Sequence, residues 1–261
     1  MPASPYSRRI QRAQELVKRH SFAGEILEFY IRVAHFQEEF HRQLEKSHGT
    51  SAIFEIGHEN QSVFATKFEA FLAMVERHGP ATSADVARQL QSQGRAFQSD
   101  LLPAAWADLS PSHPYGFLAQ AFLQPYAEYL RSQQSLPPAQ GKCASCPFCH
   151  RRPGFGVLRS MGEGAARSLV CSFCLAEWDF RRLVCPGCGE EDDKELSVFT
   201  AAEFDYIRVE CCDTCKTYIK TIDLTKDGRA EPIVDELASA PLDLWAQEHG
   251  YAKLHPNLLG M

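Results

Sequence analysis

The residues with the clearest chemistry in this chain are its cysteines. All ten lie between Cys143 and Cys215, and eight of them form Cys-x-x-Cys pairs. A two-residue gap lets one tight turn aim two sulfurs at a single ion, and a second such turn completes a tetrahedral site. The four pairs therefore predict two metal sites. In chain order the pairs are Cys146 and Cys149, Cys171 and Cys174, Cys185 and Cys188, and Cys212 and Cys215.

The intervals between the pairs assign them to sites. Successive pairs are separated by 21, 10 and 23 residues. The longer intervals accommodate a β-hairpin, whereas ten residues span only one extended strand. The pattern also repeats, since Cys146 precedes Cys185 by 39 positions and Cys171 precedes Cys212 by 41. We therefore expect the first two pairs to share one metal and the last two pairs to share another.

Three residues beside the pairs also have metal-binding side chains. Cys143 precedes the first pair, Cys211 adjoins the fourth, and His150 follows Cys149. We interpret all three as bystanders, because both four-sulfur sets are complete without them. Gly189 occupies the position equivalent to His150 after the third pair, where such a turn favours a residue that tolerates a positive φ.

The chemistry of an all-thiolate site suits either zinc or a single iron, and geometry does not separate them. A redox-active dithiol would require a helix N-terminus after the motif to lower a thiol pKa, but strand-like sequence follows these pairs. Elsewhere the chain has no G-x-S-x-G, P-loop or H-E-x-x-H motif. We therefore predict no catalytic residues and no enzymatic activity.

Short strands must position the cysteine pairs. The strands expected in the first repeat are 155–160, 166–170 and 177–184, with a turn at Gly162–Gly164. Those expected in the second repeat are 196–200, 206–210 and 216–224. The result is a tandem pair of rubredoxin-like or zinc-ribbon modules, in which bound metal supplies much of the folding free energy.

The part of the chain before the cysteines has a helical pattern. From Phe22 to Leu44, seven apolar residues are spaced three or four apart and line one face of a helix. We expect about four helices packed as a bundle. The aromatic residues are interpreted as its core, and the seven histidines as solvated or edge-of-core residues, because they lack paired ligand spacing.

Local signals bound the other expected helices. A second helix over 60–78 ends at Gly79-Pro80. A third is capped by Ser83 and runs into the nineties. After a break over 109–114, a fourth covers 115–130 and is interrupted or kinked at Pro125.

Composition and charge limit the possible partners. The 261 residues carry a net charge of −6, concentrated in the C-terminal tail, so no positive field exists for nucleic acid or an anionic membrane. The N-terminus lacks the apolar core of a signal peptide, and no run approaches the ~20 apolar residues that span a bilayer. We expect a soluble chain in a reducing compartment that binds no nucleic acid and does not insert into a membrane.

These observations predict an α+β, multidomain chain: an N-terminal helical bundle followed by two small metal-binding β modules. The segment rich in Ser, Gln and Pro marks the linker. The acidic tail is expected to pack on the ribbons, with partner docking as the alternative. The expected segments are a helical domain 1–131, a linker 132–142, a first ribbon 143–184, a second ribbon 185–230 and an acidic C-terminal segment 231–261.

The ribbon half resembles the formate dehydrogenase accessory protein FdhE family. The ordered motifs CPFC, CSFC, CPGC and CDTC carry the resemblance, with their contexts SLVCSFCLAEW and CCDTCKTYIKTIDL and the tail DELASAPLDLWAQEHGY. Good matches cover about residues 143–251, and the helical half matches loosely around 12–16 and 34–37. The departures are Cys143, Cys211, and His150 where a glycine is more usual.

The resemblance implies a cytoplasmic accessory factor, not a formate dehydrogenase. Such a factor binds the catalytic subunit of formate dehydrogenase, is needed for assembly of active enzyme, and carries iron at two rubredoxin-type sites. Two other functions are a rubredoxin-like redox or electron-transfer protein acting on that client and, least favoured, a zinc-ribbon nucleic-acid-binding protein. The family's ligand sets fall on Cys146, Cys149, Cys171 and Cys174 for one iron, and on Cys185, Cys188, Cys212 and Cys215 for the other, with zinc as the alternative metal.

Overall fold

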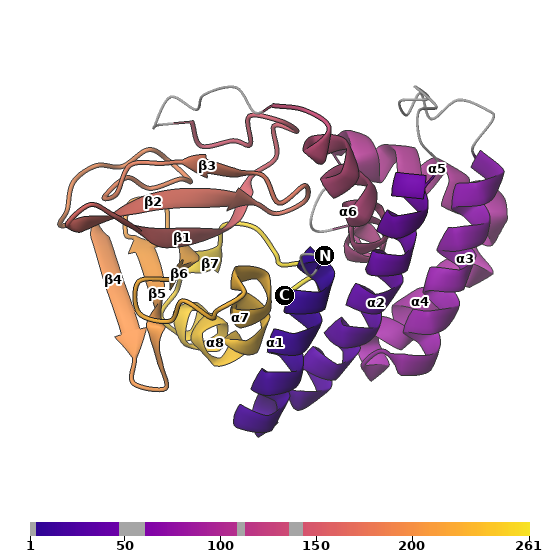
Figure 1. Cartoon of the computed structure of the whole chain (residues 1–261), viewed down its shortest axis with the longest axis horizontal. Coiled ribbons are helices and arrows are strands. Elements are labelled where there is room, and N and C mark those ends of the chain that lie inside the picture. The colour runs from indigo at the N-terminus through magenta and orange to yellow at the C-terminus, as the bar shows by residue number, and fades with distance from the viewer. Residues whose placement is uncertain (1–3, 47–60, 109–112, 136–142) are drawn as a thin grey trace.

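The architecture is known from a computed structural model, which describes residues 4–46, 61–108, 113–135 and 143–261. Helices of the N-terminal half lie on one side of the molecule and a β-sheet lies on the other (Figure 1). Two helices near the C-terminus lie between them, and the first of the two packs against both the N-terminal helix and the sheet. The predicted α+β class, with helices followed by a cysteine-bearing sheet, is confirmed.

Six α-helices precede the first cysteine in the described part of the chain. They are α1 (Pro5–Arg19), α2 (Gly24–Lys46), α3 (Gln61–His78), α4 (Ala81–Ser92), α5 (Gly94–Asp108) and α6 (Gly116–Ser132), with a 3₁₀ turn at Ser21–Ala23 before α2. Aromatic side chains make the core of this half: Phe122 on α6 lies between Phe68 of α3 and Phe40 of α2, with ring centroids 4.9 Å and 5.3 Å away.

The predicted second helix coincides with α3, and the first coincides with α2 except at its start. Phe22 precedes α2 and is 49% exposed, so the apolar stripe begins later than expected. The Ser83 cap was wrong, because α4 already starts at Ala81 after Pro80. The expected third helix, running into the nineties, corresponds to α4, and Gly94, with a positive φ, separates it from α5, a further helix that was not predicted.

At Pro125 we expected an interruption or a kink, and the helix is not interrupted, because α6 continues through this proline. Residues on both sides of this proline are buried, and their packing offsets the hydrogen bond that proline cannot donate. Helix α1 was not predicted because its buried face includes Arg9 and Arg12, and these charged residues interrupt the apolar periodicity. The expected break over 109–114 and the linker 132–142 fall mostly outside the described residues.

Both ribbons belong to one sheet. Its strands are β1 (Pro153–Met161), β2 (Gly164–Cys171), β3 (Glu177–Asp179), β4 (Leu196–Ala201), β5 (Phe204–Cys212), β6 (Thr217–Asp223) and β7 (Ala252–Lys253). Their order is β3-β2-β1-β6-β5-β4, and β7 pairs with β6. Within each ribbon the strands are antiparallel, whereas β1 and β6 pair in parallel and join the ribbons.

The join between the ribbons depends on a glycine. Gly156 of β1 lies opposite Thr221 of β6, and a Cβ at this position would strike the threonine hydroxyl. The continuous sheet shares one hydrophobic core with the helices, so neither ribbon is limited to its own small core. We retain the division into five segments as a proposal.

Five of the six predicted strands are found close to the expected residues. The exception is the closing strand 177–184, of which only β3 at 177–179 is extended in the sheet. The rest crosses the sheet as a loop, because the Arg167 side chain of β2 donates hydrogen bonds to the carbonyls of Arg181 and Val184. The turn between β1 and β2 contains Gly162 at φ +57°, as its sequence predicted.

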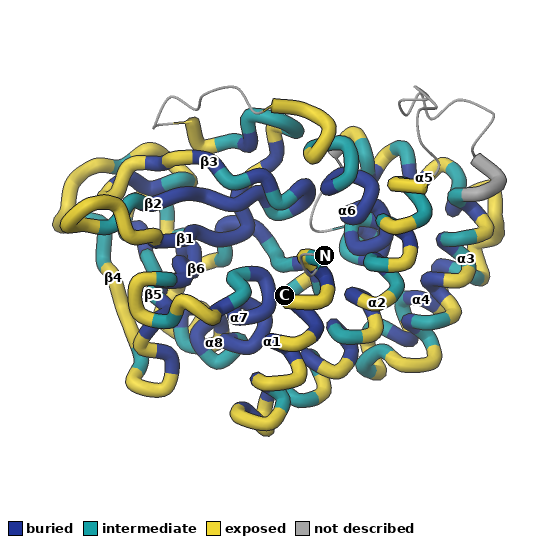
Figure 2. The backbone as a smooth tube through the Cα atoms, in the orientation of Figure 1, coloured by how far each residue is buried: buried dark blue, intermediate teal, exposed yellow. Residues whose placement is uncertain are grey.

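The C-terminal segment covers one face of the sheet. Helix α7 (Pro232–Ala238) contacts β1, β6, α1 and α2, and α8 (Ala240–Glu248) leads into β7. Most residues of α7 and of the strands beside it are buried (Figure 2). Three acidic residues of this segment turn inward, where they form ion pairs with basic residues: Asp235, Glu236 and Asp243. Among the helices in the described ranges, none combines the length and apolar character that crossing a bilayer requires.

Candidate metal centres

The first cluster consists of the thiols of Cys146, Cys149, Cys171 and Cys174. Cys171 ends β2, and the other three lie on the turns beside it. The sulfurs of Cys146 and Cys174 are 3.5 Å apart, and those of Cys149 and Cys171 are 3.3 Å apart. Three of the four residues are buried and Cys149 is half-buried. The structure therefore brings the first two sequence pairs together, as their spacing predicted.

The second cluster consists of Cys185, Cys188, Cys212 and Cys215. Cys212 ends β5, and Cys215 lies on the turn that leads into β6. The Cys185 and Cys215 sulfurs are 3.7 Å apart, and those of Cys188 and Cys212 are 3.6 Å apart. This cluster is more open than the first, because Cys188 is exposed and Cys215 is half-buried.

Each of the four turns places its second cysteine before a residue with a positive φ. The four residues are His150 at +60°, Leu175 at +53°, Gly189 at +82° and Lys216 at +54°. In two of the turns this bend lets a backbone N–H hydrogen-bond the first cysteine's carbonyl, from His150 to Cys146 and from Gly189 to Cys185, both at 2.9 Å. The predicted equivalence of His150 and Gly189 is confirmed.

Backbone N–H groups in the turns point at sulfur. Cys146 accepts from Phe148 N at 3.4 Å, Cys171 from Phe173 N at 3.4 Å, and Cys185 from Gly187 N at 3.3 Å. These donors favour the thiolate form that binds metal. The Thr217 hydroxyl has the same effect on Cys215: burial alone would raise the pKa of this thiol, but hydrogen bonds from Thr217 lower it to about 7.

The geometry of both clusters fits a tetrahedral ion. With metal–sulfur bonds of about 2.3 Å, a tetrahedron places its sulfurs about 3.8 Å apart. The observed separations of 3.3–3.7 Å lie slightly inside that value. All ten cysteines lie in the described part of the chain, and none forms a disulfide. The donor sets therefore suit zinc or a single iron and leave the choice open.

The three neighbouring residues stay outside both clusters. The exposed Cys143 donates its thiol to the Ser145 carbonyl at 3.1 Å. Cys211 is buried, and burial, with the charges of Asp213 and Cys212, raises its pKa to about 12, so it remains a thiol. His150 serves as the turn residue described above.

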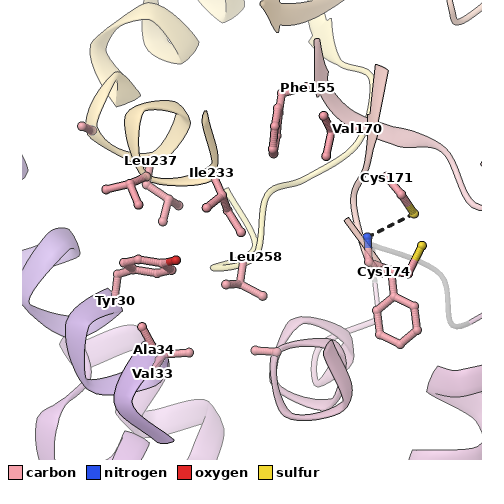
Figure 3. Close-up of a cluster of buried hydrophobic side chains, with 14 of the residues drawn as sticks. Tyr30, Val33, Ala34, Phe155, Val170, Cys171, Cys174, Ile233, Leu237 and Leu258 are labelled. Atoms are coloured by element: carbon pink, nitrogen blue, oxygen red, sulfur yellow. Dashed lines mark hydrogen bonds between the residues drawn. The ribbon is translucent and has the colours of Figure 1, made fainter. Parts of the chain in front are cut away.

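The first cluster is embedded between the sheet and the helices, which the sequence did not predict. Arg151 follows its first turn, stacks 3.7 Å from the Phe173 ring, and donates to the carbonyls of Ala105 and Trp106 at the end of α5. Phe173 itself packs edge-on against Trp106, with centroids 5.6 Å apart. Figure 3 shows Cys171 and Cys174 at the edge of a core that also contains side chains of α2 and α7.

Buried ion pairs fix the helices to the second ribbon. Arg12 of α1 donates to Asp235 of α7 at 2.6 Å, and Asp235 also accepts from the Tyr206 hydroxyl of β5 at 2.8 Å. The sequence did not predict these ion pairs, because a single arginine on a helix is usually interpreted as exposed to solvent. The only signal was the loose family match around residues 12–16.

Comparison with known proteins identifies the family. The description "FdhE, central domain" matches residues 145–182, and "FdhE, C-terminal domain" matches residues 184–259. A "Protein FdhE homolog" of Aquifex aeolicus is 32% identical over 198 residues, which cover 76% of this chain and 70% of that protein. The chain belongs to the FdhE family. The resemblance inferred from the cysteine motifs is thereby confirmed.

Other FdhE-family relatives extend the match to the helical half. A homologue from Pseudomonas putida is 34% identical, but the matched region covers only 60% of its length. One from Haemophilus ducreyi is 24% identical across 100% of this chain and 91% of its own. The crystal structure of the FdhE protein from Pseudomonas aeruginosa has a TM-score of 0.68 at 23% identity over 99% of this chain and 97% of that one, so both halves share its fold.

Proposed function

We propose that this chain is a cytoplasmic accessory factor that binds the catalytic subunit of formate dehydrogenase and is needed for assembly of active enzyme. The observation that carries the proposal is the pair of four-thiol clusters in a chain of the FdhE family. The factor itself is proposed not to be an enzyme and not to bind nucleic acid, in keeping with a net charge of −6.

We also propose that each cluster holds one iron ion, with zinc as the alternative. The N–H groups aimed at sulfur and the sulfur–sulfur spacing support metal binding at both clusters. Iron would add one-electron chemistry that zinc lacks, whereas either ion would crosslink the two turns of a ribbon. The proposed ligands are Cys146, Cys149, Cys171 and Cys174, and Cys185, Cys188, Cys212 and Cys215.

Metal analysis tests the identity of the ion. Protein purified without added metal is measured for iron and zinc, together with its visible absorption. Near two irons per chain with thiolate-to-iron charge-transfer bands is the expected result. Two zincs and no colour would replace iron with zinc and make both clusters structural. No stoichiometric metal would contradict the proposed sites.

Paired cysteine variants test the maturation role. Replacing both Cys185 and Cys188 by serine is expected to remove metal from the second cluster and to abolish activation of the client formate dehydrogenase. Cys143→Ser is the matched control, because this exposed thiol lies outside both clusters and should change neither readout. Full activation by the variant that lacks the second metal would contradict the proposal.

A redox role is a second candidate, and the exposure of Cys188 favours it. An electron-transfer site must come close to its partner, and the second cluster has an exposed cysteine whereas the first has none. A rubredoxin-like function requires iron at this cluster. If protein loaded only with zinc restores formate dehydrogenase activity as well as the iron form does, the redox role is excluded and docking remains.

A further inference from the structure

A hollow on the sheet lies next to the second cluster. It opens on the face away from α7 and α8: in β6, Lys220 reaches those helices while its neighbour Ile219 lines the hollow. The floor is formed by Leu158, Ile219 and Leu196, and one wall by the loop that crosses the sheet. Cys185 and Cys212 also line it, so the geometry of the second cluster sets one end of this space. We call it the β4 hollow.

The β4 hollow carries charge of both signs: arginines line it, and the thiolates of the second cluster add negative charge at one end. Three arginines and one glutamate line it. Arg167 is paired with Glu210, and Arg208 lies 3.4 Å from Asp223. The third, Arg182, is exposed and forms no ion pair within the described residues. An anionic group entering the hollow would therefore find an unpaired guanidinium.

Two apolar side chains that line the β4 hollow are exposed to solvent. Leu183 is 61% exposed and Val198 is 46% exposed, and both line the hollow. Leu183 has φ +54°, a conformation that branched aliphatic residues rarely adopt. Backbone strain of this kind costs free energy, and strained residues are concentrated at functional sites, where a side chain must be held in a defined position. Exposed leucine and valine beside a free arginine are typical of a protein-binding patch.

Strand β4 leaves a backbone edge open beside this patch. It ends the sheet and pairs with β5 alone among the described strands. Its six residues, Leu196–Ala201, include no charge and no proline, the usual protection of an edge strand. Such an edge is a template to which an extended segment can add.

We propose that the β4 hollow and the open edge of β4 form the docking surface for the client, and that the client presents an extended segment with a carboxylate beside apolar side chains. The segment pairs with β4, covers Leu183 and Val198, and places its carboxylate against Arg182. This inference rests on the proposed function and specifies its contact. The occupant is a partner rather than a second copy, because the β4 strand of a second copy carries no charged residue and would present no carboxylate to Arg182.

The experiment measures binding of the full-length chain to the purified catalytic subunit of formate dehydrogenase from the same organism. Arg182→Glu and Val198→Lys are each expected to raise Kd about tenfold or more. The matched controls carry the same changes elsewhere: Arg152→Glu at another exposed arginine and Met161→Lys at a 68% exposed apolar side chain. Both controls should bind like the parent chain.

The outcomes separate this inference from the proposed function. If the parent chain binds and both hollow variants bind equally well, the docking surface is wrong while the proposed function stands. If the parent chain does not bind the catalytic subunit, the proposed function is wrong, and the docking surface that depends on it is wrong as well. If light scattering shows a dimer that Val198→Lys converts to a monomer, the edge serves self-association and the proposal is overturned. Metal content and circular dichroism verify that each variant is folded.

Discussion

At the scale of single residues, the buried charges beneath the second ribbon control stability. Glu236 lies within 3.1 Å of Lys220 and contacts Lys253, and all three side chains are almost completely buried. Burial alone would raise the pKa of Glu236, but the two ammonium groups hold it at about 2, below its ordinary value of 4.5. The carboxylate is therefore more stable in the folded chain than in the unfolded one.

This pKa predicts a specific acid sensitivity. The pKa of Glu236 is lower in the folded chain than in the unfolded chain, so its ionised carboxylate stabilises the fold. This stabilisation is fully present above pH 4.5 and is lost as the pH falls toward 2. The difference in pKa corresponds to about 3 kcal/mol. Glu236→Gln should lower the free energy of unfolding by about 3–5 kcal/mol at pH 7, since it leaves a buried lysine poorly paired. Urea unfolding across this pH range measures both effects. The exposed Glu248→Gln is the control, and equal losses in both variants would contradict the assignment.

The turn residues after the cysteine pairs permit a second test at this scale. His150 has a left-handed backbone that costs a non-glycine residue about 1 kcal/mol. His150→Gly should therefore keep or slightly raise stability and leave metal content unchanged, because the imidazole lies outside the cluster. Gly189→Ala should cost about 1 kcal/mol from the backbone alone, since no atom lies within 4 Å of the added Cβ. Loss of metal on His150→Gly would instead make this histidine a ligand.

At the scale of elements, the first cluster and helix α5 act as one unit through Arg151. Its guanidinium donates hydrogen bonds to the carbonyls of Ala105 and Trp106 near the end of the helix, and it stacks on Phe173, which lies between two of the cluster's cysteines. We therefore expect a change in the first cluster to affect the packing of α5. The second cluster has no equivalent contact with α5 among the described residues.

Arg151→Ala is expected to lower the free energy of unfolding by about 3 kcal/mol, from the lost hydrogen bonds and the lost stacking. It should also speed metal release to a chelator from the first cluster, measured in protein whose second cluster carries Cys185→Ser and Cys188→Ser. The adjacent Arg152 is exposed, so Arg152→Ala should stay within about 0.5 kcal/mol of the parent chain. Similar behaviour of the two variants would show that the cluster and α5 are not coupled.

At the scale of the whole molecule, sequence reasoning succeeded where a local pattern decides the structure. Both cysteine clusters follow from turn geometry and spacing, and both hairpins follow from short apolar runs, of which the first surrounds a glycine turn. Contacts between distant elements have no such local pattern. The parallel pairing of β1 with β6 is one of these, because nothing within either ribbon requires it.

The position of the acidic tail shows the same limit. We expected the tail to pack on the ribbons, but its charge pattern did not indicate that Asp235 and Glu236 would be buried, because their partners, Arg12 and Lys220, lie 223 and 16 residues away in sequence. A charge pattern along one segment carries no information about a partner on another. The same reason explains why α1, with its buried arginines, was not predicted.

The tail therefore holds both halves together, which a matched pair of variants tests. Leu237 of α7 is completely buried in the core shared by the helices and the sheet, whereas Leu244 of α8 is 61% exposed. Leu237→Asp should lower the free energy of unfolding by more than about 4 kcal/mol, because it places a charge in that core. Limited proteolysis should then cleave the helical half and the sheet at the same rate, since they lose their common support together. Leu244→Asp should change neither measurement, and a protease-resistant helical half in the Leu237→Asp chain would show that the halves fold independently.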